Sequence, residues 1–140
     1  MADEKVARVR ICVAATFPDQ HPETSPQHAI VLNYKAMPGV VTEQDSMFAP
    51  FNLGVTLVHE AGHYFGLAHT FNSNTCSGDN DGVPDTPVER SPASGCPVNP
   101  PRDSCPSQPG LDPVRNFMDY SDDACMTSGF TPLQVTHKTV

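Results

Sequence analysis

The chain of 140 residues lacks tryptophan, carries few cations and has no long apolar run. Eight lysines and arginines stand against sixteen aspartates and glutamates, which gives a formal net charge of −8. So acidic a chain is not suited to nucleic acid or to anionic membrane surfaces, and no segment is long and apolar enough to span a membrane. Because hydrophobic residues make up only 38% of a chain long enough for one domain, its core should be lean.

Cysteine pairs of the C-x-x-C type, which would indicate a structural zinc site, are absent. The chain nevertheless has five cysteines. Cys12 stands alone and is compatible with a buried free thiol, whereas the other four lie in the second half: Cys76, Cys96, Cys105 and Cys125. Without metal-type spacing these four predict two disulfides, which form in an oxidising compartment.

Export signals are missing as well. The start of the chain is charged, the apolar stretch from Ile11 to Ala15 is too short for a signal peptide, and there is no N-x-S/T glycosylation site. A chain whose cysteines indicate export, but which carries no export signal, is expected to lack its N-terminus. A short helix expected from Thr131, with Pro132 at its first position, stops almost at the chain end, which suggests a missing C-terminus too.

The strongest signal lies between residues 59 and 69, where His59, Glu60, His63, Gly66 and His69 complete the pattern H-E-x-x-H-x-x-G-x-x-H. On a helix the first two histidines share one face and lie about 6 Å apart along the axis, so both can reach one ion. Gly66 permits a left-handed backbone that turns the chain and brings His69 to the same ion. Three protein ligands leave a fourth position open, as in catalytic zinc sites.

Glu60 is rotated beside the two helical histidines and is better placed to hold a water molecule than to bind the metal. The alternative is an amphipathic helix with surface histidines, but chance rarely supplies all five of these positions. His21 and His28 have no ligand spacing and are expected to be exposed polar side chains.

Apolar and turn-forming patterns predict four elements. A strand is expected within Val6 to Phe17 and a second strand at Ala29 to Tyr34. A helix is expected at Leu53 to Phe65 with Asn52 as its N-cap, followed much later by the short helix from Thr131. Within the long helix, the residues opposite the histidines are expected to be mostly buried: Leu57, Val58, Ala61, Tyr64 and Phe65.

Downstream of the zinc pattern, Asn116-Phe117-Met118-Asp119-Tyr120-Ser121 looks like the Met-turn of metzincins. The stretch from about Ala15 to Gln134 resembles secreted metalloproteases of the pappalysin (cytophagalysin-like) family, especially the fungal extracellular ones. Besides the Met-turn and the zinc helix, the matching pieces are Ala15 to Pro18, Ile30 to Gly39, Phe51 to Gly54, Asp85-Thr86-Pro87, Asp112-Pro113 and Phe130-Thr131-Pro132.

The resemblance implies an α+β fold of the metzincin type. It implies a partial N-terminal sheet, a central active-site helix and an irregular, disulfide-linked C-terminal subdomain. Residues 1–140 would form a single, incomplete catalytic domain, with 1–69 as the remnant of the N-terminal subdomain and 70–140 as the C-terminal subdomain. The family's long N-terminal subdomain exceeds the 58 residues that precede His59, so most of its sheet and its backing helix would be absent.

The resemblance also implies roles for individual residues. Met118 would form a hydrophobic floor beneath the zinc, for which ordinary core packing is the alternative, and Tyr120 would stabilise the transition state. Ala29 to Asn33 would be the edge strand that pairs with an extended substrate. The implied disulfides are Cys76–Cys105 and Cys96–Cys125. The loop after Cys76 resembles a calcium-binding loop in some members, with a turn-rich solvated loop as an equal alternative. Its candidate ligands are Asp79, Asp81, Val83, Asp85 and Thr86.

These features predict a secreted zinc endopeptidase in which Glu60 acts as general base toward the attacking water. The cofactors would be one catalytic zinc ion and, in the loop, calcium. The partners would be polypeptide substrates bound by a monomer. Two alternatives remain open: an inactive, zinc-binding fragment that acts only through protein interaction, and a structural module stabilised by disulfides and calcium.

Overall fold

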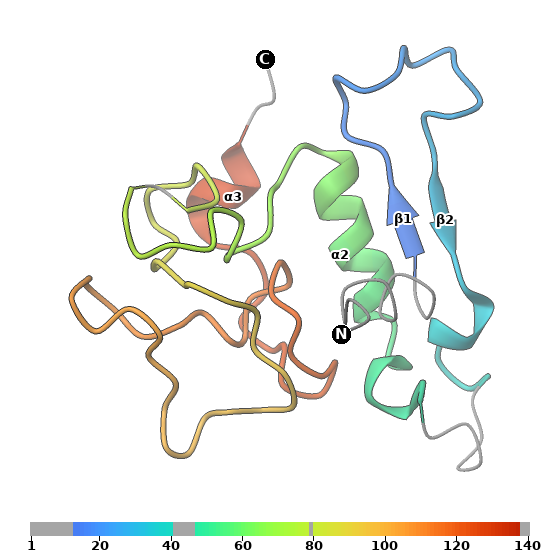
Figure 1. Cartoon of the computed structure of the whole chain (residues 1–140). Coiled ribbons are helices and arrows are strands. Elements are labelled where there is room, and N and C mark those ends of the chain that lie inside the picture. Colours follow the sequence, from blue (N-terminus) through green and yellow to red (C-terminus); the bar gives the residue numbers. More distant parts are fainter. Residues whose placement is uncertain (1–12, 41–46, 79, 138–140) are drawn as a thin grey trace, which may run out of the picture.

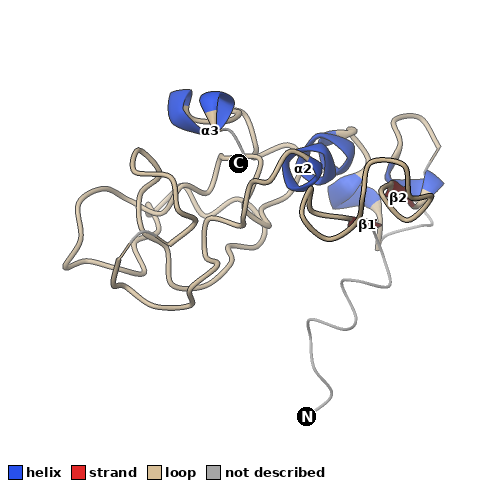
Figure 2. Ribbon diagram, turned by 90° about the horizontal axis from the view of Figure 1, so that it is seen from above, coloured by secondary structure: helices blue, strands red, loops and turns tan. Residues whose placement is uncertain are grey.

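The computed structural model describes residues 13–40, 47–78 and 80–137. Two short strands, β1 (Val13–Ala15) and β2 (Ile30–Leu32), precede the helix α2 (Val55–Tyr64), and the helix α3 (Pro132–Thr136) lies near the end. Two single turns of 3₁₀ helix, at Tyr34–Ala36 and Ala49–Phe51, connect β2 with α2. Figure 1 shows α2 between the two strands on one side and the loop-rich second half on the other, and Figure 2 shows the same order from above. In the described part of the chain, no helix has the length and apolar character needed to cross a membrane.

The two strands pair in antiparallel fashion, with Val13 opposite Leu32 and Ala15 opposite Ile30. The backbone N–H of Thr16 donates to the carbonyl of Ala29 over 3.2 Å, which continues the ladder beyond β1. The second strand thus lies within its predicted range. The first predicted strand is described only at its end, because Val6, Val9, Ile11 and Cys12 fall outside the described residues.

α2 begins two residues later than predicted, and Asn52 is not its N-cap. The N-cap is Gly54, whose φ of 92° lies in the left-handed region. The capping acceptor comes from the far end of the chain, because Oδ2 of Asp123 accepts from the N–H of Leu53 at 2.8 Å and of Val55 at 3.3 Å. The helix is therefore capped by the carboxylate of Asp123, which is distant in the sequence, and not by the side-chain amide of Asn52 as predicted.

The C-terminal end of α2 follows the prediction made for Gly66, which has a φ of 93°. The N–H of Leu67 donates to the carbonyl of Gly62, and the N–H of Gly66 donates to that of His63, both at 2.9 Å. This pair of bonds is a Schellman motif, which satisfies the last carbonyls of the helix and turns the chain.

The expectation that the apolar side of α2 is mostly buried is wrong. The buried residues of α2 are polar or small: Thr56, His59, Glu60, Gly62 and His63. By contrast, Leu57 and Val58 are 39% and 36% exposed and Phe65 is 67% exposed. The helix packs its histidine face against the second half of the chain, and it also contacts both strands of the narrow sheet, with Glu60 next to Ala15 of β1.

The second half is held together by disulfides and buried polar groups rather than by regular structure. Disulfides join Cys76 to Cys105 and Cys96 to Cys125, the two pairs that the resemblance implied. α3 begins as predicted, with Thr131 as N-cap and Pro132 in the first turn. The side chains with least exposure include Met118, Glu89, Thr70, Asp119 and Ser121, so the lean core contains carboxyl groups.

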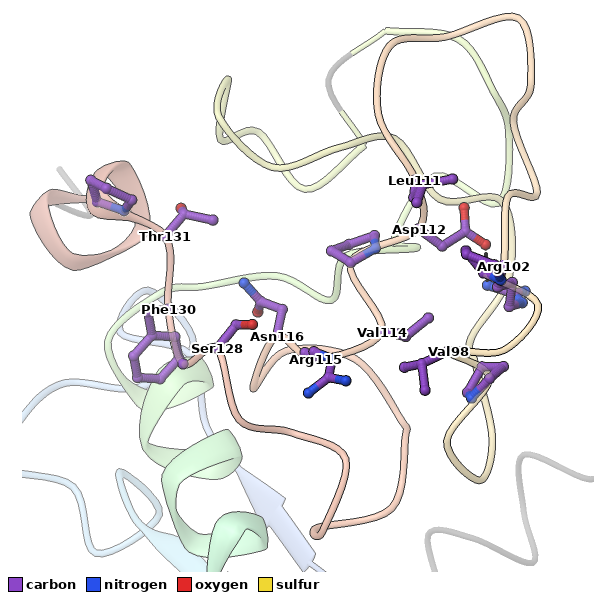
Figure 3. Close-up of a pocket in the computed structure, with 15 residues that line it drawn as sticks. Val98, Arg102, Leu111, Asp112, Val114, Arg115, Asn116, Ser128, Phe130 and Thr131 are labelled. Carbon is purple, nitrogen blue, oxygen red and sulfur yellow. Dashed lines mark hydrogen bonds and ion pairs between the residues drawn. The ribbon is translucent and has the colours of Figure 1, made fainter.

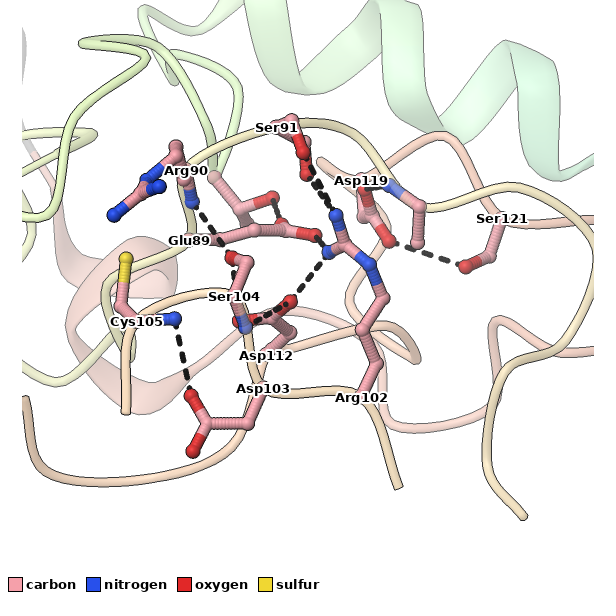
Figure 4. A network of polar contacts seen from close by, with 12 residues as sticks. Glu89, Arg90, Ser91, Arg102, Asp103, Ser104, Cys105, Asp112, Asp119 and Ser121 are labelled. Carbon is pink, nitrogen blue, oxygen red and sulfur yellow. Dashed lines mark hydrogen bonds and ion pairs between the residues drawn. The ribbon is translucent and has the colours of Figure 1, made fainter. Parts of the chain in front are cut away.

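Arg102 is the centre of a buried ion network (Figure 4). Its guanidinium contacts the carboxylates of both Glu89 and Asp112 and donates to the carbonyl of Ser91 at 2.8 Å. Glu89 also accepts from Oγ1 of Thr70 at 2.8 Å, next to His69. One cation thus contacts two buried carboxyl groups, and hydrogen bonds from Thr70 and Ser104 reach their oxygens.

Asp123→Ala should destabilise the protein, because the N–H groups of Leu53 and Val55 lose their acceptor at the start of α2. We expect the free energy of unfolding to fall by about 1–3 kcal/mol, measured by urea denaturation followed by circular dichroism. Asp122→Ala is the control, since it removes the neighbouring carboxylate and leaves the cap in place. Equal losses in the two variants would contradict the capping role.

Stability should also depend on pH through Glu89. Burial, followed by the charge of Asp119, raises the pKa of Glu89 from 4.5 to about 8, and Arg102 opposes this rise. The folded state then keeps a proton that the unfolded chain has released, so the stabilisation is complete below pH 4.5 and is lost as the pH rises through about 8.

Glu89→Gln removes this titration. The free energy of unfolding of the variant should therefore fall less steeply with rising pH than that of the wild type, measured by denaturation at a series of pH values. The exposed Glu23→Gln is the matched control. Parallel curves for wild type and Glu89→Gln would refute the assignment.

Candidate metal centre

The three predicted histidines converge on one point. The Nε2 atom of His63 lies 3.1 Å from Nε2 of His59 and 3.0 Å from Nε2 of His69, and the third separation is 3.2 Å. Ligands about 2.0–2.1 Å from a tetrahedral zinc lie about 3.3 Å apart, so these separations fit one zinc ion. α2 supplies His59 and His63, and the turn at Gly66 brings in His69.

The hydrogen bonds of His59 and His63 determine which ring nitrogen of each residue can bind a metal ion. Nδ1 of His59 lies 2.6 Å from the carbonyl of Phe117, and Nδ1 of His63 lies 2.7 Å from that of Leu67. A carbonyl only accepts, so each Nδ1 carries the proton and each Nε2 presents a lone pair. Two lone pairs that face each other need a cation between them.

A proton is a poor candidate for that cation. Burial, followed by the charge of His63, lowers the pKa of His59 to about 3, although the bond to Phe117 opposes this shift. Burial also lowers the pKa of His63. Neutral imidazoles that converge in this way have the donor set that zinc prefers.

Met118 lies directly beneath the metal-binding face of α2. Its side chain is fully buried, and a Cβ atom added at Gly62 would overlap its sulfur. The same added atom would lie 3.3 Å from the ring of Phe130. A side chain at position 62 would therefore force the buried Met118 to shift, which the zinc pattern alone did not indicate.

Tyr120 belongs to an aromatic group around the histidines. Its ring centroid is 4.8 Å from that of His69, 5.7 Å from that of His59 and 4.9 Å from that of Phe71. Phe71 in turn stacks on His69 with an interplanar angle of 9°. The predicted catalytic tyrosine thus lies beside two of the three ligands.

Glu60 is buried on the same face of α2. Burial raises its pKa to about 7, and a hydrogen bond from the backbone of Ala15 opposes that rise. Because the next N–H, that of Thr16, points to β2, the N–H of Ala15 points away from β2, to the edge of β1 that no strand of the described residues pairs with. β1, rather than the Ala29–Asn33 strand, thus presents the sheet edge that faces Glu60.

His28 is half-buried, not exposed as predicted. Its ring stacks on that of Tyr64 in α2, with centroids 4.6 Å apart and an interplanar angle of 14°. Its Nε2 atom is buried without a hydrogen-bond partner. His28 therefore packs against the helix from the side of the sheet.

The calcium prediction gains no support from the structure. Asp79 lies outside the described residues, and Asp81 and Asp85 accept hydrogen bonds from α3. Burial raises the pKa of Asp81. Within residues 13–40, 47–78 and 80–137, the histidine triad is the one group of three or more His, Cys, Asp or Glu side chains placed to share an ion.

A cavity of about 580 Å³ opens elsewhere in the second half, away from the histidines (Figure 3). Its walls are mostly apolar, with Val98, Leu111 and Val114 on one side and Phe130 on the other. None of the three histidines lines it, so it is not part of the metal centre.

A family profile matches almost the whole sequence of the chain. The profile of the peptidase M43 family, described as pregnancy-associated plasma protein-A, matches residues 3–139. The chain belongs to this family. Membership of M43 confirms the predicted resemblance.

Several M43 relatives are named extracellular metalloproteases. One from Pyricularia oryzae is 61% identical over 84 residues, which cover 60% of this chain and 28% of the relative. Another from Colletotrichum graminicola is 51% identical over 102 residues, which cover 70% of this chain and 36% of the relative.

Among solved structures, mature mirolysin of Tannerella forsythia in complex with a cleaved peptide is similar, with a TM-score of 0.73 and 32% identity. That match covers 90% of this chain and 45% of mirolysin. It confirms the predicted α+β metalloprotease fold. The chain thus spans less than half the length of each of these proteins.

Gly62→Ala tests the contact beneath the helix. An alanine in a helix is usually more stabilising than glycine by about 1 kcal/mol, but here its methyl group meets Met118. We expect the free energy of unfolding to fall by about 1–3 kcal/mol and zinc affinity to fall with it, measured by urea denaturation and by competition with a chromophoric chelator.

The double variant Gly62→Ala/Met118→Ala supplies the control. If the methyl group acts through the sulfur, the double variant is less destabilised than the sum of the single variants. Strict additivity would show that the two residues do not interact.

Proposed function

We propose that this chain carries the catalytic centre of a secreted zinc endopeptidase. The proposal rests chiefly on one observation: the Nε2 atoms of three histidines converge within 3.2 Å, with a buried glutamate on the same helix. Family membership and the names of the extracellular relatives support it. The two disulfides are consistent with secretion.

A zinc ion held by His59, His63 and His69 would acidify water and polarise the scissile carbonyl. Glu60, buried on α2 beside His59, is suited to accept the proton of the attacking water and to pass it to the leaving amine. Tyr120 donates its hydroxyl proton in a hydrogen bond to the developing oxyanion. The carbonyls of Phe117 and Leu67 keep the histidines oriented throughout.

The substrate would lie along the sheet edge that faces Glu60. An extended peptide can pair with backbone groups on an open edge, and the open edge next to Glu60 belongs to β1. We therefore assign main-chain pairing with the substrate to β1 instead of Ala29–Asn33.

The alternative function is an inactive zinc-binding fragment that acts through protein interaction. The exposure of Leu57, Val58 and Phe65 on α2 favours it, because apolar side chains on a helix next to a metal site can bind another protein surface. A purified chain with one zinc ion and no cleavage of unfolded protein substrates would support this alternative.

Glu60→Gln separates metal binding from catalysis. We expect the variant to bind one zinc ion per chain, as the wild type does, and to cleave an unfolded protein substrate about 10²–10⁴-fold more slowly, because the general base is lost. Metal analysis and a fluorescence assay of cleavage measure the two properties.

The control is Glu23→Gln, which makes the same chemical change on an exposed loop. It should leave both zinc content and cleavage rate unchanged. If Glu60→Gln keeps full activity with zinc bound, Glu60 is not the general base.

A further inference from the structure

Gln134, in the first turn of α3, is 3% exposed and uses both ends of its side-chain amide. Its Oε1 accepts from Nδ2 of Asn116 at 2.8 Å and from the backbone N–H of Thr131 at 2.9 Å. Its Nε2 donates to Oδ2 of Asp81 at 3.3 Å. A buried amide thus connects three segments that are far apart in the sequence.

The orientation of each amide in this chain of bonds is determined by its backbone partners. Oδ1 of Asn116 accepts from the N–H of Met118 at 2.8 Å, so Nδ2 of Asn116 has to be the donor toward Gln134. At the other end Oδ1 of Asp81 accepts from the N–H of Val83 at 3.0 Å. Backbone N–H groups only donate, so no amide can flip without losing bonds.

We propose that Asp81, Gln134 and Asn116 form a directional hydrogen-bond relay that positions Met118 beneath the zinc-binding histidines. The relay rests on the proposed zinc function, because the position of Met118 affects function only if the three histidines bind zinc. None of the three residues touches the reacting atoms, so they are positioning residues.

The backbone of Met118 is held at both ends. Asn116 accepts from its N–H, and its carbonyl accepts from the N–H of Thr70 at 3.2 Å, directly after His69. The side chain between these two bonds rests against Gly62 of α2. A rotation of Asn116 would therefore be transmitted to the floor of the metal centre.

Hydrogen bonds of its side chain hold Asn116 in place. Asn116 and Thr131 both line the cavity of about 580 Å³ (Figure 3), and Asn116 is 4% exposed. Its two hydrogen bonds fix its orientation, and Gln134 supplies one of them. The relay thus gives α3 a role in the metal centre, although α3 contributes no ligand.

The test uses two single variants and their combination. Asp81→Asn places the new amide NH₂ against Nε2 of Gln134, because the side-chain oxygen that remains at residue 81 has to accept from the N–H of Val83. Gln134→Glu places a carboxylate against that of Asp81. In the combined variant the amide of residue 81 donates to the carboxylate of residue 134, which still accepts from Asn116 and Thr131, so every donor again has an acceptor.

We expect each single variant to shift the methyl resonance of Met118 in the zinc-free protein, observed by NMR with labelled methionine. We also expect zinc affinity to fall by about 10-fold, a usual loss when an outer-shell partner is removed. The combined variant should restore both values toward those of the wild type. The methyl resonance is assigned with Met118→Leu.

Gln108→Glu is the matched control, because it makes the same substitution at an amide that donates to the carbonyl of Cys76 and not to the relay. It should change neither the Met118 resonance nor zinc affinity. If a single variant does not fold, Asp81→Ala is used in its place. It removes the acceptor of Gln134 without placing two donors or two carboxylates against each other.

Two outcomes would overturn the relay. One is a loss of stability in the single variants with an unchanged Met118 resonance and zinc affinity, which would make the network merely structural. The other is an additive loss in the combined variant, as expected if Asp81 served as a calcium ligand instead. Both readouts are independent of peptide cleavage, so an inactive wild type would refute the proposed function and leave this test intact.

Discussion

The contact between the sulfur of Met118 and the backbone of Gly62 is the constraint on which the metal centre depends. α2 and the second half of the chain share little regular structure, so close contacts decide how they fit together. With glycine at 62, the helix can rest on Met118. The carbonyl of Phe117 then reaches His59, and the carbonyl of Met118 binds the chain next to His69. These contacts therefore join the helix, the turn and the predicted third ligand to the same segment of the chain.

Around this contact the protein supplements a small apolar core with paired ions, hydrogen-bonded amides and disulfides. Arg102 holds two carboxylates, and Gln134 satisfies buried groups from three segments. Groups of this kind stabilise a fold only when each finds its partner, because an unpaired buried charge or amide costs several kcal/mol. The two disulfides limit the entropy of the unfolded chain and so offset the small apolar area.

Patterns confined to a few neighbouring residues could be predicted from the sequence. The helix carrying His59 and His63, the turn at Gly66 and the cap at Thr131 all depend on short-range spacing, and the structure contains them. The Met-turn follows from the resemblance and stays a prediction, while the structure places Met118 against Gly62.

Features that depend on residues far apart could not be predicted in this way. The true start of α2 depends on Asp123, and the ion network joins Thr70, Glu89, Arg102 and Asp112. The exposure of Leu57 could not be predicted either. Helical periodicity shows that two faces of a helix differ, but it does not show which face another element covers. Gln134 looked like an ordinary residue of a short helix, because nothing local marks an amide as a link between segments.

The cap of α2 also has a consequence for the order of events during synthesis. The ribosome delivers Leu53 and Val55 long before Asp123, which lies 70 and 68 residues further on. A ten-residue helix is too short to persist in water by itself. The nascent helix therefore lacks its cap until Asp123 has emerged, so the segment that holds His59 and His63 is completed by residues made much later.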